Sequence, residues 1–175
     1  MKKNIKYEDL EFEKYIENYK ILERTKQISD QINGRYINDE VVFVGILNGC
    51  IPFMNELLSN VTIPYKYNFI KISSYSKTES GNIKFELGLS EDDIFDKTII
   101  VIEDIIDSGK SIKFIHNYLS EFNPKSIKVA SLLIKEESIG LCDWYGFKIS
   151  DKFVIGFGMD IDDSFRYLKD IYQKV

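Results

Sequence analysis

The fold is decided by one stretch, Ile99-Ile100-Val101-Ile102-Glu103-Asp104-Ile105-Ile106-Asp107-Ser108-Gly109-Lys110-Ser111. Its apolar, β-branched start predicts a strand that is covered on both faces, as the strands of a parallel sheet are. Two adjacent carboxylates follow, and a short turn of small residues then opens an amphipathic helix that the spacing predicts over about 110–120. The sequence therefore predicts a strand, a turn and a helix, with polar side chains at the carboxyl end of the strand.

The segments on either side repeat this alternation of strand and helix. Apolar residues at helical spacing predict a helix that Asn18 caps and that Gly34 ends as its C′ residue. Residues 7–16 alternate loosely and predict an edge strand or an extended arm, whereas the polar residues 74–90 predict a long loop. Strands that alternate with helices imply an α/β domain with a mainly parallel sheet, in which ligands bind beyond the carboxyl ends of the strands. Strands are predicted at 41–47, 65–73, 98–102, 126–134 and, as the last, 153–157, with a further helix at 51–59.

Length and composition are those of one globular domain. The chain has 175 residues, of which 44% are hydrophobic and 29% charged, so it can bury a core without disulfides or a structural metal. The formal net charge is 23 − 28 = −5, which argues against a protein that works mainly by neutralising nucleic-acid phosphates. We therefore expect no nucleic-acid partner.

Cysteine usage and hydropathy indicate a soluble, cytoplasmic protein. Cys50 and Cys142 are too few for a disulfide scaffold or a zinc cluster, and we interpret both as reduced thiols. The basic start of the chain is not followed by the apolar core of a signal peptide. No apolar run approaches the roughly 20 residues that span a bilayer, so we expect no membrane partner.

The turn after the central strand has the features of a phosphate site. A turn that opens a helix presents free backbone N–H groups, the hydroxyls of Ser108 and Ser111 lie beside them, and Gly109 keeps the backbone accessible. The triplet Gly-Lys-Ser suggests an ATP-binding P-loop, but that motif needs a glycine where this chain has Asp104. We therefore exclude an ATP-type P-loop.

The carboxylates beside this turn need partners other than the phosphate, which they would repel. Sugar hydroxyls and Mg²⁺ are suitable partners, because carboxylates accept hydrogen bonds and Mg²⁺ prefers oxygen ligands together with substrate phosphates. A phosphorylated ribose would satisfy all these groups at once. The alternative is that Glu103, Asp104 and Asp107 are acids that the dipole at a helix N-terminus favours, without a ligand.

Residues 99–111 resemble the phosphoribosyl-diphosphate signature of the type I phosphoribosyltransferases, and the run Glu-Asp-Ile-Ile-Asp-Ser-Gly resembles their hypoxanthine-guanine branch. The resemblance implies the type I phosphoribosyltransferase fold, a mainly parallel, twisted sheet flanked by helices. It implies one domain, 1–175, with a core at about 35–140 and a small hood region from about 1–17 and 141–175. Further motifs that carry the likeness, in the expected order, are 44–49, 73–75, 133–135, 143–149, 151–157, Asp160 and Phe165-Arg166.

The resemblance implies an enzyme of purine salvage. Such an enzyme transfers the 5-phosphoribosyl group from phosphoribosyl diphosphate to hypoxanthine or guanine, giving IMP or GMP and diphosphate, with Mg²⁺ as the cofactor. Glu103 and Asp104 would hold the ribose hydroxyls and magnesium, and Asp107 would act as the general base. The 5′-phosphate would lie against Asp107, Ser108, Gly109, Lys110 and Ser111.

The resemblance also implies roles outside the central stretch. Lys135 would hydrogen-bond the 6-oxo group of the purine and disfavour adenine, whose 6-amino group is a donor. Phe153 would stack on the purine, and Val154 would offer backbone groups to its edge. Asp160, at the purine end of the site, would ligate a second magnesium, and Arg166 would meet the diphosphate.

The diphosphate-binding turn departs from the family pattern. Where the family has Leu-Lys-Gly, this chain has Leu47-Asn48-Gly49. The main-chain amides of the turn would still bind diphosphate, but the missing cation predicts weaker diphosphate affinity or a different subunit contact. Ser74 and Tyr75 would begin a flexible loop that closes over the reaction and excludes water.

Other interpretations remain open on the sequence. A sensor of phosphoribosyl diphosphate or a nucleotide would have the same fold, but it would need a basic or added nucleic-acid-binding element and would not need Asp107 or Lys135. A xanthine-preferring enzyme is equally compatible with the motifs. The resemblance also implies a homodimer or homotetramer, with the turn at 47–50 and the helix after it as candidate interface elements. His116 and Trp144 are interpreted as surface or packing residues.

Overall fold

A computed structural model describes residues 4–74 and 83–175 and contains two sheets. The larger sheet has six strands in the order β5-β4-β3-β6-β7-β8. Five of them run parallel, and only β5 is antiparallel, to its neighbour β4. The prediction of an α/β domain with a mainly parallel sheet is confirmed. The strands are β3 (Val41–Leu47), β4 (Tyr65–Ser74), β5 (Ile83–Leu87), β6 (Thr98–Ile106), β7 (Ser126–Lys135) and β8 (Trp144–Ile149).

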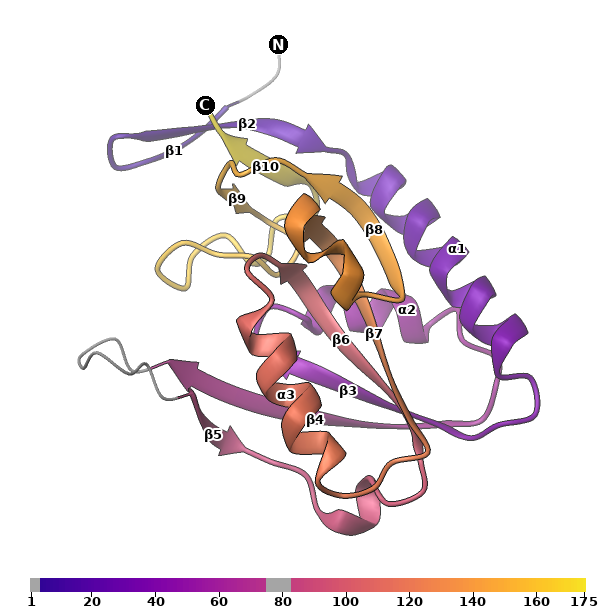
Figure 1. The fold of residues 1–175 in the computed structure, drawn as a ribbon. Coiled ribbons are helices and arrows are strands. Elements are labelled where there is room, and N and C mark those ends of the chain that lie inside the picture. The colour runs from indigo at the N-terminus through magenta and orange to yellow at the C-terminus, as the bar shows by residue number, and fades with distance from the viewer. Residues whose placement is uncertain (1–3, 75–82) are drawn as a thin grey trace.

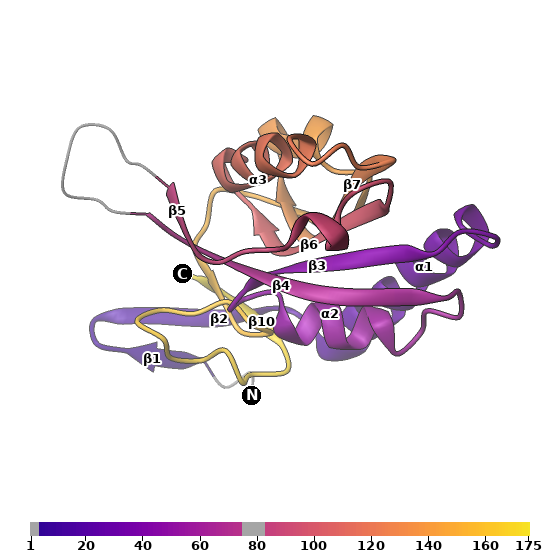
Figure 2. The ribbon, with the colours of Figure 1, turned by 90° about the horizontal axis from the view of Figure 1, so that it is seen from below.

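Helices cover both faces of this sheet (Figures 1 and 2). The helices α1 (Asn18–Arg35) and α2 (Ile51–Leu58) pack on one face, and α3 (Lys110–Ser120) packs on the other. Alternate residues of β6 therefore point into two different cores, Ile100 toward α1 and α2, and Ile99 toward α3. This explains why the strand is a continuous apolar run, as the sequence pattern indicates. Two 3₁₀ segments, η1 (Glu91–Asp93) and η2 (Glu136–Leu141), follow β5 and β7.

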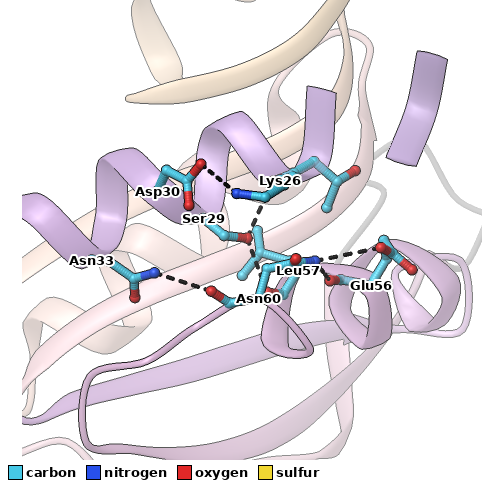
Figure 3. A network of polar contacts seen from close by, with 8 residues as sticks. Lys26, Ser29, Asp30, Asn33, Glu56, Leu57 and Asn60 are labelled. Atoms are coloured by element: carbon cyan, nitrogen blue, oxygen red, sulfur yellow. Dashed lines mark hydrogen bonds and ion pairs between the residues drawn. The ribbon is translucent and has the colours of Figure 1, made fainter. Parts of the chain in front are cut away.

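Polar contacts hold α1 against α2 (Figure 3). The Ser29 hydroxyl donates to the Leu57 carbonyl at 2.9 Å, and the Asn33 amide donates to the Asn60 carbonyl at 3.0 Å. The Asn33 side-chain oxygen in turn accepts the backbone N–H of Thr62 at 2.8 Å. These bonds engage two carbonyls and one N–H at and just after the carboxyl end of α2, where backbone groups lack partners within the helix. They fix α2, and with it the turn that precedes α2, against the longer helix.

The smaller sheet has four antiparallel strands in the order β1-β2-β10-β9. It joins the two ends of the chain and lies beyond the carboxyl end of β6 (Figure 1). Residues 7–16, for which the pattern allows a strand or an arm, fall mostly in the hairpin of β1 and β2. The strands are β1 (Ile5–Tyr7), β2 (Leu10–Ile16), β9 (Val154–Ile155) and β10 (Ile171–Lys174).

One loop prediction and one strand prediction are wrong. Part of the predicted loop 74–90 is the strand β5, which pairs with β4 with a register irregularity between Lys71 and Ile72. Of the predicted last strand, 153–157, only Val154 and Ile155 form a strand, β9. Gly156 and Phe157 have positive φ angles and are therefore not in the extended conformation. The last strand is β10, which is too short and too polar to give a clear pattern. Residues 144–149 of the motif at 143–149 form β8, which pairs with β7 in the larger sheet.

The predicted ends of α1 are wrong as well. Glu17 occupies the N-cap position, and Asn18 is the first helical residue, whose side chain donates to the Lys169 carbonyl at 3.0 Å. Gly34 lies inside the helix, which ends at Arg35. Tyr36 is the C-cap residue instead: its N–H makes the last helical hydrogen bond, to the Ile32 carbonyl, and its buried ring packs edge-on against Trp144. None of the described helices is both long enough and apolar enough to cross a membrane.

Candidate active site

Two buried carboxylates lie near the carboxyl end of the central strand. Glu103 and Asp104 lie within β6 itself, each 8% exposed, so the strand extends past the predicted end at Ile102. Burial, and next the charge of Asp104, raise the pKa of Glu103 well above its usual value. One Asp104 oxygen accepts the backbone N–H of Ile105 at 2.9 Å. These carboxyl groups are held at the carboxyl end of a parallel strand, where ligands of such sheets bind.

The turn between β6 and α3 leaves backbone donors free. Gly109 adopts the left-handed conformation at φ +69° and is the N-cap of α3, and none of the side chains described supplies a cap there. The first N–H groups of a helix have no partner within it, so those at the start of α3 are available to a ligand. A cavity of about 90 Å³ opens at this point and is lined by residues 105–112 together with Glu103. The structure therefore brings all five residues of the predicted phosphate turn, 107–111, around one small cavity.

A second cavity, of about 260 Å³, adjoins the first. The two cavities share Ile105 and Asp107 in their linings. The second is formed where the end of β6 meets the end of β7 and the segment 151–160 that contains β9. Six residues that were predicted for the site line it together: Asp104, Asp107, Lys135, Phe153, Val154 and Asp160.

Lys135 and Asp107 form an ion pair inside this cavity. The Lys135 Nζ lies 2.6 Å from Asp107 Oδ1 and 3.5 Å from Asp151 Oδ1. The hydrogen bond to Asp107 raises the pKa of Lys135 above its usual value. Lys135 is only 15% exposed, whereas Asp107 is 63% exposed. The cation is therefore held in place by the carboxylate to which the family resemblance gives the role of general base.

The rest of the cavity wall is largely apolar. Phe153 is 48% exposed, and its ring is tilted relative to that of the buried Phe12, with ring centroids 6.4 Å apart. Val154 is buried. Met159, which the sequence reasoning missed, also lines the cavity. An exposed ring beside a cavity offers a flat apolar surface to a flat ligand.

The turn at 47–49 lies against the Asp104 carboxylate. A Cβ atom on Gly49 would overlap the Asp104 carboxylate, and one on Gly158 would overlap the Gly49 carbonyl. Only glycine therefore allows this close approach of two backbones and a carboxylate. The Leu47–Asn48 peptide bond is cis, and the Asn48 side chain is exposed.

Arg166 and Asp160 are paired with each other. The Arg166 guanidinium lies 2.8 Å from Asp160 Oδ1 and 3.1 Å from Asp163 Oδ1, and it donates to the Gly158 carbonyl at 2.8 Å. The second Asp160 oxygen accepts the backbone N–H of Asp163 at 2.8 Å. Asp160 thus lines the larger cavity with both oxygens already engaged. Within residues 4–74 and 83–175, no three metal-binding side chains meet, so Asp160 does not join Glu103 and Asp104 in one cluster.

Several predicted residues lie outside the two cavities as far as the chain is described. Leu47, Asn48 and Arg166 line neither of them. Ser74 is the last residue of β4, and nothing is described of its side chain; Tyr75 lies outside the described residues.

Two contributors were given no role from the sequence, although Asp151 begins the motif at 151–157. Asp151 approaches Lys135, and Ser138 donates its hydroxyl to the Asp107 carbonyl at 2.5 Å. Both lie after β7 rather than in the central stretch, and a serine or an aspartate in a loop is too common to single out. Only the packing of η2 against the phosphate turn reveals the role of Ser138.

Comparisons with known proteins agree with this geometry. The sequence model of the family "Phosphoribosyl transferase domain" matches residues 13–162. The hypoxanthine-guanine phosphoribosyltransferase of Homo sapiens is 33% identical over 177 residues, covering 94% of this chain and 81% of that protein. The hypoxanthine phosphoribosyltransferase of Buchnera aphidicola subsp. Schizaphis graminum is 33% identical over 153 residues, covering 83% and 85%.

Solved structures give the same result. A hypoxanthine-guanine phosphoribosyltransferase from Bacillus anthracis superposes with a TM-score of 0.85 at 30% identity, covering 93% of this chain and 96% of that one. The hypoxanthine phosphoribosyltransferase of Trypanosoma cruzi, in complex with the product IMP, has a TM-score of 0.85 at 27% identity, covering 97% and 96%. The chain therefore belongs to the phosphoribosyltransferase family and is an enzyme of its hypoxanthine-guanine branch, which serves purine salvage.

Proposed function

We propose that this enzyme transfers the 5-phosphoribosyl group from phosphoribosyl diphosphate to hypoxanthine or guanine, giving IMP or GMP and diphosphate, with Mg²⁺ as its cofactor. The observation that carries this proposal is the pair of adjoining cavities that share Asp107. One offers backbone donors to a phosphate, and the other offers a cation and an exposed ring to a purine. A 5′-phosphoribosyl group bound in the first would present its C1 carbon toward the second.

The 5′-phosphate is bound by the turn at 107–111. The free N–H groups at the start of α3 and the Ser108 and Ser111 hydroxyls donate to its oxygens, and the positive end of the helix dipole favours its charge. Gly109 allows the turn, because its φ of +69° strains any residue with a Cβ atom. The exposed Lys110 ammonium adds a positive charge at the rim.

Glu103 and Asp104 hold the ribose hydroxyls and the metal. Phosphoribosyltransferases of this family generally need a divalent metal. The two carboxyl groups are largely buried, and among the described side chains neither is paired with a lysine or arginine. Mg²⁺ is usually bound by one or two carboxylates plus substrate phosphates, so this donor set fits it. When bound, the metal supplies positive charge to the leaving diphosphate, and Asp160 is our candidate for a second such site.

Asp107 and Lys135 act on the purine. The Asp107 carboxylate accepts the proton from the purine nitrogen that attacks C1, as a general base. The Lys135 ammonium donates to the 6-oxo oxygen, which adenine lacks. Phe153 stacks on the ring, and the backbone of Val154 contacts its edge. Bond formation at C1 and proton transfer to Asp107 thus occur on one side of the same cavity.

Diphosphate leaves on the opposite side of the sugar. The main-chain amides of Leu47, Asn48 and Gly49 are the donors we assign to it, together with Arg166. The contact of Gly49 with Asp104 supports this assignment, because it brings the turn beside the group that holds the sugar. For Ser74 and Tyr75 the loop role remains a prediction from the family resemblance, because Ser74 ends β4 and Tyr75 lies outside the described residues.

An activity assay tests the proposed function. Purified protein is incubated with phosphoribosyl diphosphate, Mg²⁺ and one base at a time, and products are separated by chromatography. We expect IMP from hypoxanthine and GMP from guanine, with little AMP from adenine. Parallel reactions with xanthine and with mixtures of the three oxopurines rank their kcat/KM values. No nucleotide from any oxopurine would refute the proposal.

We further propose that the enzyme is a homodimer or homotetramer in the cytoplasm. An apolar face over α2 and β4 supports the assembly: Ile51 and Tyr67 are 49% and 57% exposed beside a cavity of about 370 Å³. This face follows directly on the turn at 47–50. Light scattering during gel filtration tests it, with Tyr67→Asp expected to shift the mass toward the monomer. Cys50 and Cys142 are both free thiols, which supports a reducing compartment.

A further inference from the structure

A cavity of about 340 Å³ lies between α3 and the segment that follows β7. It shares no lining residue with the purine-side cavity and only Ile112 with the phosphate-side cavity. Figures 1 and 2 show α3 and η2 lying side by side on the same face of the sheet. The cavity is therefore behind the phosphate turn rather than in front of it, and no step of the reaction uses it.

The floor of this cavity is apolar. Ile112 of α3 and Val129 of β7 are 4% and 5% exposed, and Ile127 and Leu141 lie beside them. The size falls within the range of about 300–1,000 Å³ that is usual for small-molecule sites. An apolar floor of this kind favours a ligand with a hydrocarbon body, because burying that body removes apolar surface from water.

One wall of the cavity carries unpaired donors. Lys113, His116 and Asn117 are spaced three and four residues apart and therefore lie on one face of α3. All three are exposed, and across the part of the chain that the structure describes their side chains make no hydrogen bond or ion pair. They place an ammonium, an imidazole and an amide along the same wall of the cavity.

The opposite wall does not offset that positive charge. Asp143 is the carboxylate nearest the cavity, but one of its oxygens lies 2.9 Å from Lys128 Nζ and the other accepts the Val129 N–H at 2.9 Å. The Cys142 thiol donates to the Trp144 carbonyl at 3.0 Å. The groups left to bind a ligand are thus an apolar floor and a wall that donates hydrogen bonds and carries positive charge.

We propose that this cavity binds a small organic anion whose hydrocarbon body lies on the floor and whose acidic group meets Lys113, His116 and Asn117. The site does not depend on the proposed reaction. It lies behind the phosphate turn, and η2 joins the two: Leu141 lines the cavity and packs against Gly109, while Ser138 donates to the Asp107 carbonyl. An anion that presses on Leu141 therefore stabilises the turn in its phosphate-binding conformation, and this coupling rests on the proposed function.

Binding is tested with 2-naphthoate, an aromatic carboxylate, by isothermal titration calorimetry on the full chain. Gly140→Phe fills the cavity, and the variant is expected to fold because a Cβ atom there meets open space. Gly34→Phe is the matched control, since Gly34 is also a helical glycine with open space around it, on the remote helix α1. Thermal melting verifies that both variants are folded.

The expected result is binding to the wild type and to Gly34→Phe but not to Gly140→Phe. Lys113→Ala should weaken the affinity by up to about fivefold, the upper end of what one exposed charge contact contributes. Lys26→Ala, which removes a lysine from α1, should leave it unchanged. The site is refuted if 2-naphthoate fails to bind at millimolar concentration, or if Gly140→Phe binds it as the wild type does.

The coupling is tested by repeating the titration with saturating IMP. Linkage requires that two ligands that favour the same conformation each tighten the binding of the other by the same factor. We expect 2-naphthoate to bind several-fold more tightly, and IMP to gain the same factor. Unchanged affinities, with IMP shown to bind, overturn the coupling. Failure of IMP to bind would count against the proposed function instead, because the first titration contains no nucleotide.

Discussion

Lys135 Nζ lies 2.6 Å from Asp107 Oδ1, and this pair joins the ends of two neighbouring parallel strands at the cavity that we assign to the purine. Asp107 also belongs to the lining of the phosphate-side cavity. One carboxylate therefore lines both cavities, and its partner Lys135 is the cation that we assign to the 6-oxo group of the purine. We assign proton acceptance to Asp107 and recognition of the base to Lys135. Substitutions at 107 and 135 should therefore change different kinetic quantities, kcat in the first case and the preference among bases in the second.

Asp107→Asn should lower kcat by about 10²–10⁴-fold, the usual contribution of general-base catalysis. The amide keeps the shape but accepts no proton. The affinity for phosphoribosyl diphosphate, measured by calorimetry, should change far less, because the backbone donors of the turn remain. Asp151→Asn is the control, since it removes only the 3.5 Å contact with the same lysine. A fall in kcat no larger than that of the control would remove Asp107 from this role.

Lys135→Met should act on the choice of base. A hydrogen bond from a charged donor contributes about 1.5–3 kcal/mol, so kcat/KM for hypoxanthine should fall by about 10–150-fold. The kcat/KM for adenine should change much less, so the ratio of kcat/KM for hypoxanthine to kcat/KM for adenine should fall. Lys148→Met is a matched control, because Lys148 lies on the neighbouring strand β8 and is likewise paired, with Glu136 at 2.6 Å. Equal losses for both bases would contradict the assignment.

The central stretch could be predicted because local pattern and tertiary role agree there. A strand covered on both faces must be apolar throughout, and a helix that begins at a phosphate turn needs small residues and a glycine with positive φ. Both requirements are visible in residues 99–111, and the structure has β6, the turn and α3 in that order. The roles of Lys135, Phe153 and Asp160 came from the family resemblance, and their meeting around one cavity was not visible in local sequence.

The start of α1 could not be predicted for the opposite reason. Asn18 has the residue type of a cap, yet the acceptor for its backbone N–H is Asp170, 152 positions along the chain, at 2.8 Å. Asp170 also forms an ion pair with Lys14 at 2.6 Å. The helix is therefore capped by a residue from the far end of the chain, and no window of local sequence contains that signal. β8 and β10 were missed for a similar reason, because pairing partners rather than apolar runs define them.

Asp170→Ala should reduce stability, because it removes this cap and the ion pair together. Loss of an N-cap acceptor costs about 0.5–2 kcal/mol, and Asp170→Asn, which keeps an acceptor oxygen, should cost less. The measurement is urea unfolding followed by circular dichroism. Glu17→Ala is the control, since Glu17 occupies the N-cap position without a side-chain cap bond. A larger loss for Glu17→Ala would contradict this account.

The contribution of Asp170 should depend on pH. Burial raises the pKa of this carboxyl, but the hydrogen bonds and charge of Lys14, with the Asn18 N–H, outweigh burial and leave the pKa below its usual value. A carboxyl group whose pKa is lower in the folded than in the unfolded state contributes its full stabilisation when the pH is above the pKa of the unfolded state, near 3.9. The stability difference between wild type and Asp170→Asn should therefore be constant at neutral pH and shrink as the pH falls below about 4. A difference that grows on acidification would contradict the sign of the shift.

Asn48→Lys should strengthen the binding of the diphosphate group. The turn at 47–49 touches Asp104 through Gly49, and Asn48 itself is exposed, so a lysine fits without displacing another side chain. It adds a positive charge where the family has one, and Arg166 on the other side is already paired with Asp160 and Asp163. An exposed charge contact is worth about 0.2–1 kcal/mol, so KM for phosphoribosyl diphosphate should fall by up to about fivefold.

Screening by salt should abolish most of this gain at an ionic strength near 1 M, where the Debye length is about 3 Å. Steady-state kinetics at two salt concentrations checks both points, and Asn48→Gln, which adds length without charge, separates the effect of the cation from that of size. If Asn48→Gln lowers KM as much as Asn48→Lys does, the missing charge is not what limits diphosphate binding in this enzyme.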